Sequence, residues 1–324
     1  MTVITAMKFN PSHGALVADE QVSDGNRKVN ISEKIVSGSF EGWMSYAVGF
    51  SGLCSLSNEV ELVVPQILAE EFQKKERSLT ARQGVNLFAN ASLSIRRSYI
   101  DNYLYTHYGL TEEQFQRGKK TNNDESDIFS ISSRIMDHYI WLIGDDGKLS
   151  REFPLTFVGL IEAEEEKGIR LYDFSTLDSG TLSPAAFPYA TEGSGSDVAD
   201  LELADFLENM PRSKRKDIDP FEGLAALLRA TSRAVRRNMG VGGVPSIHIL
   251  KEGKLLVPED NVSQLAMHIA RGTMERYLPK KFEREALESL LYSGEDWKAI
   301  DHEMYKTAKD KDGLRRLLSG YKKD

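Results

Sequence analysis

Residues 1–9 read MTVITAMKF, a short run in which β-branched and apolar residues follow a threonine. Such a run favours a β-strand, here the first strand of a core sheet. Thr2 is small enough for ordinary removal of Met1, which would leave one residue carrying both a hydroxyl and a free α-amine. An α-amine has an ordinary pKa of about 8, and threonine with its own amine is a known form of activated nucleophile. Residue 2 is therefore a candidate nucleophile at the start of a strand, although many chains begin with Met-Thr.

The pattern after this run predicts more strands and then helices. Residues 14–22 form a second β-rich run, joined to the first by the turn-forming residues at 10–13. Residues 34–39 and 43–51 predict a further pair of strands. The apolar spacing then becomes helical over 60–72, with Pro65 able to bend that helix, and again over 87–99.

The second half of the chain repeats this order after an irregular stretch. Residues 109–134 are polar and charged without a sustained period, which predicts an exposed insertion. Strands are predicted at 139–143, 155–163 and 169–174, helices after GSGSD at 193–197 and over 221–235, and a final hairpin at 245–257. From residue 260 the sequence is helical and strongly charged. Strands and helices thus occur in blocks, which predicts an α+β fold with sheets packed against helical layers.

Composition limits the function. The 324 residues carry a net charge of −8, which argues against nucleic acid as the main partner. No stretch of about 20 apolar residues predicts a membrane span, and the start of the chain does not read as a secretory signal. One cysteine, Cys54, fits a reducing compartment, so we expect a cytoplasmic protein. The six histidines have no metal-ligand spacing, so neither a metal nor a cofactor is expected.

Several residues at the ends of these predicted elements suggest a site. They are Asp19 in VADEQV, Lys34 in SEKI, Gly49 in AVGFSG and Ser194 in GSGSD. Taken alone, the first two are equally compatible with a surface ion pair, the glycine with a crowded sheet position and the serine with a helix cap. Together with Thr2, in this order, they make the chain resemble the proteasome β-subunit and its bacterial relatives among the N-terminal nucleophile hydrolases.

The resemblance covers residues 2–103 and 155–258, including the segment RRNMGVGGVPSIHIL at 236–250. It implies a four-layer αββα sandwich over residues 1–258, with an insertion at about 104–154, and a helical extension over 259–324. Leu53, Asn238 and Val241 stand where this family usually has aspartate, aspartate and serine.

The resemblance also implies a mechanism. Thr2 would attack the carbonyl carbon of a peptide or amide bond and form an ester, with its own amine moving the proton. Lys34 would lower the pKa of the hydroxyl, Asp19 would hold Lys34, and Ser194 would orient the amine. The backbone N–H of Gly49 would stabilise the oxyanion.

Substrate choice would belong to Gln21, Ala47 and Ser51, of which the last two are small and imply a roomy pocket. The expected partners are a peptide or protein substrate and further copies of the chain, in a ring-type homo-oligomer, with an ATPase as one option. Two alternatives remain open at this point. One is a transpeptidase, in which an amine resolves the ester, and the other is a non-catalytic structural or binding subunit of the same fold.

Overall fold

Two antiparallel sheets form the centre of the protein in a computed structural model. The model describes residues 2–24, 27–30, 34–40, 43–52, 54–74, 80–117, 119–121, 128–143, 155–163, 166, 168–175, 181–237 and 243–319. In spatial order, the first sheet contains β12 (Tyr189–Glu192), β1 (Ile4–Asn10), β2 (His13–Asp19), β13 (Pro245–Lys251) and β14 (Lys254–Leu256). The second contains β11 (Thr181–Pro184), β10 (Ile169–Ser175), β9 (Leu155–Ala163), β6 (Met44–Gly52) and β5 (Ile35–Phe40).

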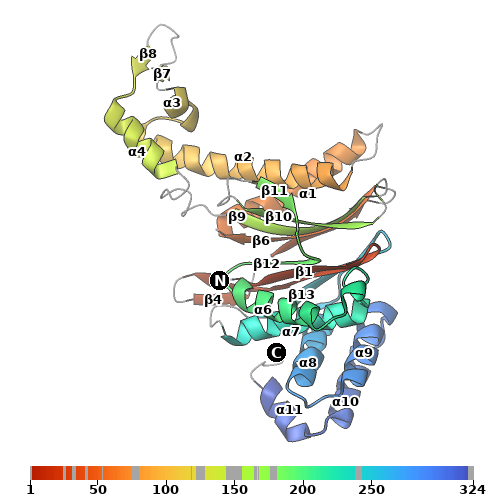
Figure 1. Cartoon of the computed structure of the whole chain (residues 1–324). Helices are drawn as coiled ribbons and strands as arrows, with labels where there is room; N and C mark the ends of the chain where they lie inside the picture. The colour runs from red at the N-terminus through yellow and green to blue at the C-terminus, as the bar shows by residue number, and fades with distance from the viewer. Residues whose placement is uncertain are drawn as a thin grey trace.

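Helices cover the outer faces of the two sheets (Figure 1). The second sheet is covered by α1 (Cys54–Gln73) and α2 (Ala81–Tyr108). The first sheet is covered by α6 (Ser196–Glu208) and α7 (Pro220–Arg237). Beyond α7 lie α8 (Asp260–Met274), α9 (Lys280–Glu288), a π-helical turn η3 (Ser289–Ser293), α10 (Trp297–Thr307) and α11 (Lys311–Leu318). The predicted α+β class is confirmed, and the structure shows that both sheets are antiparallel.

Strand β1 is buried on both of its faces. Val3, Met7 and Phe9 belong to the core under α6 and α7, whereas Ile4 and Ala6 belong to the core between the sheets. This double burial explains why the strand reads as a nearly continuous apolar run, since a strand with one wet face would alternate with polar residues. The start of the chain is thereby fixed in the middle of the first sheet, between β12 and β2.

The predicted helices after β6 are present. Pro65 lies inside α1, which nevertheless runs continuously from Cys54 to Gln73. Helix α2 begins with a capping box, in which Thr80 accepts from the backbone of Gln83 and the Gln83 side chain accepts from the backbone of Thr80. It ends at Gly109, whose φ of 66° is the left-handed conformation that favours glycine.

The predicted strand at 139–143 is wrong. These residues belong to α4 (Ser133–Ile143), which lies with α3 (Glu112–Arg117), β7 (Lys119–Thr121) and β8 (Ile128–Ser130) at the far end of α2. Tyr139 stacks on Phe115 with ring centroids 4.6 Å apart, in a small separate core with Ile100, Leu104 and Leu110. We call the described residues within 110–143, which contain α3, β7, β8 and α4 and project from the C-terminal end of α2, the arm (Figure 1). The stretch 109–134, which was predicted to be irregular, contains α3, the β7–β8 pair and the first two residues of α4.

Some short elements were not anticipated. The second predicted strand was extended to residue 22, but β2 ends at Asp19, and β3 (Gln21–Asp24) with β4 (Arg27–Asn30) forms a separate hairpin. A short 3₁₀ turn, η2 (Arg212–Lys214), connects α6 to α7. The described residues contain no helix that is long and apolar enough to cross a membrane.

Candidate active site

The turn at residues 193–195 holds Thr2. The backbone nitrogen of Thr2 lies 3.1 Å from the Ser194 hydroxyl oxygen, which accepts its hydrogen bond, and the Gly195 N–H donates to the Thr2 carbonyl at 3.0 Å. Gly193 has a φ of 92°, and a Cβ at this position would overlap the Thr2 carbonyl oxygen. A glycine is therefore required for the turn to approach the chain this closely. Ser194 is exposed and Thr2 is half-buried, so the site is open to solvent.

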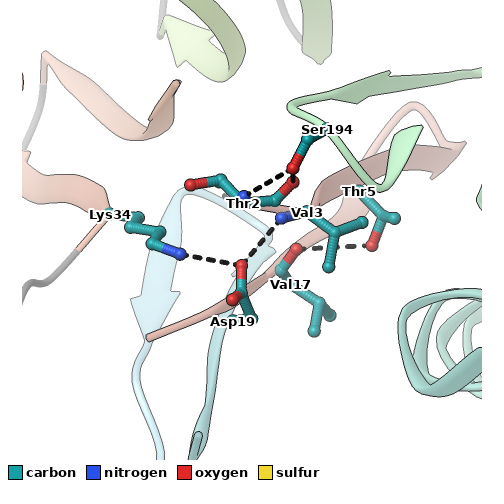
Figure 2. A network of polar contacts seen from close by, with 7 residues as sticks. All are labelled: Thr2, Val3, Thr5, Val17, Asp19, Lys34 and Ser194. Carbon is teal, nitrogen blue, oxygen red and sulfur yellow. Dashed lines mark hydrogen bonds and ion pairs between the residues drawn. The ribbon is translucent and has the colours of Figure 1, made fainter. Parts of the chain in front are cut away.

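A buried ion pair lies on the other side of Thr2 (Figure 2). The Lys34 ammonium is 2.9 Å from Asp19 Oδ1, and their side chains are only 6% and 2% exposed. The same Oδ1 accepts the Val3 backbone N–H at 2.7 Å. One carboxylate oxygen thus connects the ammonium to the backbone of the residue that follows Thr2. Such a pair is tolerated in the interior because each charge has a hydrogen-bonding partner.

The surface-pair alternative for Asp19 and Lys34 is therefore excluded. Asp19 is the last residue of β2, where its N–H donates to the Val3 carbonyl at 3.2 Å, and Lys34 precedes β5 of the second sheet. The pair consequently joins the two sheets at the end where β1 begins. The structure brings Thr2, Asp19, Lys34 and Ser194 into one neighbourhood, as Figure 2 shows.

The backbone N–H of Gly49 does not point in the direction that its predicted role as oxyanion donor requires. In an antiparallel ladder, successive N–H groups point to opposite neighbours. The Phe50 N–H donates to the Lys34 carbonyl at 2.8 Å, so the Gly49 N–H points the other way, toward Val158 of β9. A Cβ on Gly49 would overlap Ile4 of the facing sheet, so this glycine is needed for close packing of the sheets.

Gly52 is a second candidate for the oxyanion donor, and the sequence pattern did not indicate it. It ends β6, it is exposed, and its φ of 136° favours glycine. By the same alternation its N–H points to the side on which Phe50 meets Lys34. The available signal in the sequence was its place at a strand-to-helix boundary, since Cys54 begins α1.

The three predicted specificity residues differ in their surroundings. Ala47 is fully buried in the core between the sheets, so it cannot line an open pocket, and that prediction is wrong. Ser51 is half-buried near the end of β6. Gln21 begins β3, and its side chain lies outside the described part of the structure, as do Leu53, Asn238 and Val241.

A cleft of about 340 Å³ lies at residues next to the ion pair in sequence. Its lining includes Glu20 and Ile35, which are the sequence neighbours of Asp19 and Lys34, and His248. His248 Nδ1 lies 2.9 Å from the Ser37 hydroxyl and Nε2 lies 2.9 Å from the Ser246 hydroxyl. Burial lowers the pKa of His248 to about 4, so the ring is neutral at pH 7. No pattern in the sequence pointed to this cleft.

Among the described residues, no group of three or more His, Cys, Asp and Glu side chains is placed to hold a metal ion.

Comparison with known proteins gives a likeness in fold. No protein-family model matches the sequence, and no curated protein matches it. The structure resembles Anbu (ancestral beta-subunit) from Yersinia bercovieri, with a TM-score of 0.55, 12% identity, and coverage of 84% of this chain and 93% of that one. It also resembles a Gly-1 mutant of Anbu from Hyphomicrobium sp. strain MC1, with a TM-score of 0.52, 12% identity, and coverage of 80% and 86%.

These comparisons correct the resemblance drawn from the sequence. The sequence was interpreted as resembling the proteasome β-subunit among the N-terminal nucleophile hydrolases, but the two solved structures named above are Anbu proteins, and no family model matches. Short motifs such as GSGS occur in many unrelated proteins, so they do not identify a family. At 12% identity, what the chain shares with Anbu is a mixed α+β, proteasome-like fold.

Proposed function

We propose that this protein hydrolyses peptide or amide bonds with Thr2 as its nucleophile after removal of Met1. The observation that carries this proposal is the hydrogen-bonded neighbourhood of the chain start: Ser194 at the Thr2 nitrogen, and the Asp19–Lys34 pair next to Val3. An interior ion pair that serves packing alone has little advantage over apolar residues of equal volume. Its position beside the one residue that can supply both a hydroxyl and an amine supports a chemical role.

In the proposed reaction, the Thr2 hydroxyl oxygen attacks the substrate carbonyl carbon while the Thr2 amine takes its proton. The Lys34 ammonium stabilises the negative charge that develops on the attacking oxygen, and Asp19 keeps that ammonium in place. Collapse of the tetrahedral intermediate breaks the C–N bond, and the amine of Thr2 protonates the leaving amine. Water then hydrolyses the ester, which releases the acid and restores the hydroxyl.

The oxyanion requires a donor other than Gly49. We assign this role to the N–H of Gly52, because its strand position directs it to the Lys34 side of β6. One such donor typically contributes about 2.7–4 kcal/mol to transition-state stabilisation. Ser194 accepts a hydrogen bond from the Thr2 nitrogen and so orients the lone pair of the freed amine. Ser51, Gln21 and the cleft beside Ile35 are the candidate substrate contacts.

The finer assignments of fold and assembly belong to the same proposal. The helices outside both sheets support a four-layer αββα sandwich over residues 1–258, with the arm as an insertion and 259–324 as a helical extension. We propose a cytoplasmic homo-oligomer that acts on peptides, alone or fed by an ATPase. Light scattering tests the assembly, and a strict monomer at high protein concentration would count against it.

Mass spectrometry of the intact protein tests the proposed function. We expect loss of Met1 and a stable adduct with a threonine-directed epoxyketone, which requires both the hydroxyl and the free amine. Thr2→Ala should abolish the adduct, whereas Thr5→Ala should retain it, because the Thr5 hydroxyl bonds Val17 and Thr231 inside the fold. Retention of Met1 in protein from its native host would exclude the mechanism and favour the non-catalytic alternative.

A further inference from the structure

A cavity of about 380 Å³ lies where α6, α7 and α9 meet, outside the first sheet. We call it the α7–α9 cavity. Phe221, Ala225 and Arg229 line it from α7, and their spacing of four residues places them on one face of that helix. Phe206 lines it from α6 and is half-buried. These two helices thus contribute apolar groups and one arginine.

Helix α9 contributes a basic face to the same cavity. Lys280, Lys281 and Arg284 are exposed residues of the lining, and spacings of three and four residues place them on one side of the helix. Two of them have partners outside the lining. Arg284 donates to Asp219 at 2.8 Å, and the Lys281 ammonium lies 3.7 Å from Glu285. Lys280 is therefore the lysine of this face whose charge is available.

The backbone at the start of α9 also favours an anion. No side chain caps this helix at Pro279, and the Glu283 N–H donates to the Pro279 carbonyl at 3.2 Å. The N–H groups of residues 280–282 come before this bond and have no acceptor within the helix. Two lysines in this first turn are unfavourable for the helix alone, because its N-terminus already carries a partial positive charge. A bound anion would offset this repulsion.

Arg229 carries a charge that its neighbour does not fully balance. Glu283 Oε1 lies 3.6 Å from Arg229 Nε, which already donates to the Ala225 carbonyl at 3.0 Å. Glu283 is 4% exposed, and its Oε1 has no hydrogen-bond partner among the described residues. Such an orphan polar atom is uncommon in a protein interior. Burial raises the pKa of Glu283 to about 7, so below pH 7 the carboxyl is mostly uncharged and leaves the charge of Arg229 unbalanced.

Arg229 and Lys280 flank this one carboxyl. Lys280 precedes Glu283 by three residues, the spacing of neighbours on a helix face, and both cations lower the pKa of Glu283. The Arg229 side chain is 26% exposed and Lys280 is exposed, so a ligand can reach both. Neither the terminal nitrogens of Arg229 nor the Lys280 ammonium has a partner in the described part of the chain. Glu222, the other acidic residue of the lining, is seven residues before Arg229, or about 10 Å along α7.

We propose that the α7–α9 cavity binds a small molecule through a phosphate group, with Arg229 and Lys280 as its two charged contacts. The planar guanidinium of Arg229 can donate to two phosphate oxygens at once, and the lysine acts as a point charge. The half-buried Phe206 offers an apolar contact to an organic part of the ligand. The expected ligand is therefore a phosphate monoester, held by the same chemistry that would hold free phosphate.

This cavity is separate from the proposed hydrolase site. The Ile218 N–H donates to the Phe9 carbonyl at 2.8 Å, so α7 begins beside the end of β1 that is opposite Thr2. Phe221 and Ala225 belong to the first turns of α7 from that end. None of the lining residues takes part in the proposed hydrolysis, so the two proposals can fail independently.

Three probes test the proposal by isothermal titration calorimetry at pH 6.5: phenyl phosphate, phenyl sulfate and inorganic phosphate. Phenyl phosphate and phenyl sulfate have nearly the same size, but the phosphate carries more than one negative charge above its second pKa of about 6. We expect phenyl phosphate to bind about tenfold more tightly than phenyl sulfate. Inorganic phosphate that binds as tightly as phenyl phosphate would identify free phosphate as the ligand, and weaker binding would identify an ester.

A pair of double variants with the same change in net charge assigns the binding to residues. Arg229→Gln/Lys280→Gln should weaken phenyl phosphate binding at least about twentyfold. Arg316→Gln/Lys309→Gln, at exposed positions outside the lining, should change it by about twofold or less. Lys280→Gln alone should weaken binding about fivefold, and its exposed position makes a folding defect unimportant.

Glu283→Gln gives an independent readout, because it removes the charge that competes with the ligand. At pH 8, where Glu283 is ionised, we expect this variant to bind phenyl phosphate about fivefold more tightly than the unmodified protein. Equal affinities for phenyl phosphate and phenyl sulfate would overturn the proposal. So would absence of binding at about 10 mM phenyl phosphate, or unchanged affinity in both folded Arg229→Gln/Lys280→Gln and Lys280→Gln.

Discussion

Asp19 Oδ1 accepts from two donors that directly precede different strands, the Val3 backbone before β1 and the Lys34 ammonium before β5. Removal of either charge leaves the other buried without its counterpart, so we expect Asp19→Asn or Lys34→Met alone to lower the free energy of unfolding by about 3–5 kcal/mol. The double variant should lose less than the sum, because it buries no unpaired charge. Urea denaturation of all four proteins measures this coupling, and strictly additive losses would show that the pair is not energetically coupled.

Gly193 offers a second test at the chain start. Gly193→Ala introduces both an unfavourable φ and an overlap with the Thr2 carbonyl, so it should displace Thr2 and abolish the epoxyketone adduct. Gly294→Ala is the matched control, because Gly294 also has a positive φ of 68° but has open space around its Cβ position. We expect the control to lose only about 1 kcal/mol of stability and to keep the adduct. Equal behaviour of the two variants would remove the special role of Gly193.

Glu283 is buried on α9, which packs against α7, and its burial predicts that the free energy of unfolding depends on pH. It is 4% exposed, and burial raises its pKa from 4.5 to about 7, against the lowering effects of Arg229 and Lys280. Between pH 4.5 and 7 the folded chain holds a proton that the unfolded chain releases, so the free energy of unfolding falls as pH rises through this window. By pH 8 the loss amounts to roughly 3 kcal/mol. Urea denaturation at pH 5, 6, 7 and 8 measures it.

The control for this pH effect lies on the same helix. Glu283→Gln should flatten the pH dependence between pH 5 and 8, whereas Glu285→Gln should not, because Glu285 is exposed and pairs with Lys281 at the surface. A free energy of unfolding that rises with pH would contradict this prediction. If Glu283→Gln leaves the dependence of the free energy of unfolding on pH unchanged, Glu283 is not the titrating group.

Local patterns predicted elements well where the burial of an element is regular along its length. The helical spacing over 60–72 and 87–99 matches α1 and α2, which bury residues at helical spacing, and the run 2–9 matches β1, which is buried on both faces. The run YIWLI at 139–143 failed, since five β-branched, aromatic or leucine residues in a row fit a strand as well as a helix. In the structure this run is part of α4, and Tyr139 stacks on Phe115.

The site could be predicted only in part for a related reason. Lys34 was predicted to begin a strand and directly precedes β5, whereas the predicted second strand ran past Asp19, the true end of β2, to residue 22. The direction of an N–H within a ladder depends on the neighbouring strand, so Gly49 and Gly52 could not be told apart from residue type alone. Ser194 meets Thr2 across 192 positions of chain, and Ala47 is buried by residues of the facing sheet. Such contacts follow from packing, not from local spacing.

The arm and the sheets have separate cores, so we expect them to lose stability independently. Phe115 is 1% exposed in the arm, and Phe157 of β9 is fully buried between the second sheet and helices α1 and α2. Phe157→Ala should cost about 3–5 kcal/mol of global stability. Phe115→Ala should instead speed amide exchange over residues 110–143 and leave the main unfolding transition in place. Hydrogen exchange with mass analysis distinguishes the two, and a global loss in both variants would contradict independent stability.

The close contacts of residues 193–195 with Thr2 have a practical consequence for labelling this protein. The Thr2 carbonyl is bound to Gly195 and sits against Gly193, in a space without room for a Cβ. Purification tags, fluorophores or fusion partners attached ahead of Thr2 would start beside this tight turn and would block the nitrogen that the proposed mechanism uses. Labels therefore belong elsewhere, for example on the exposed face of the arm, where Trp141 is 59% accessible.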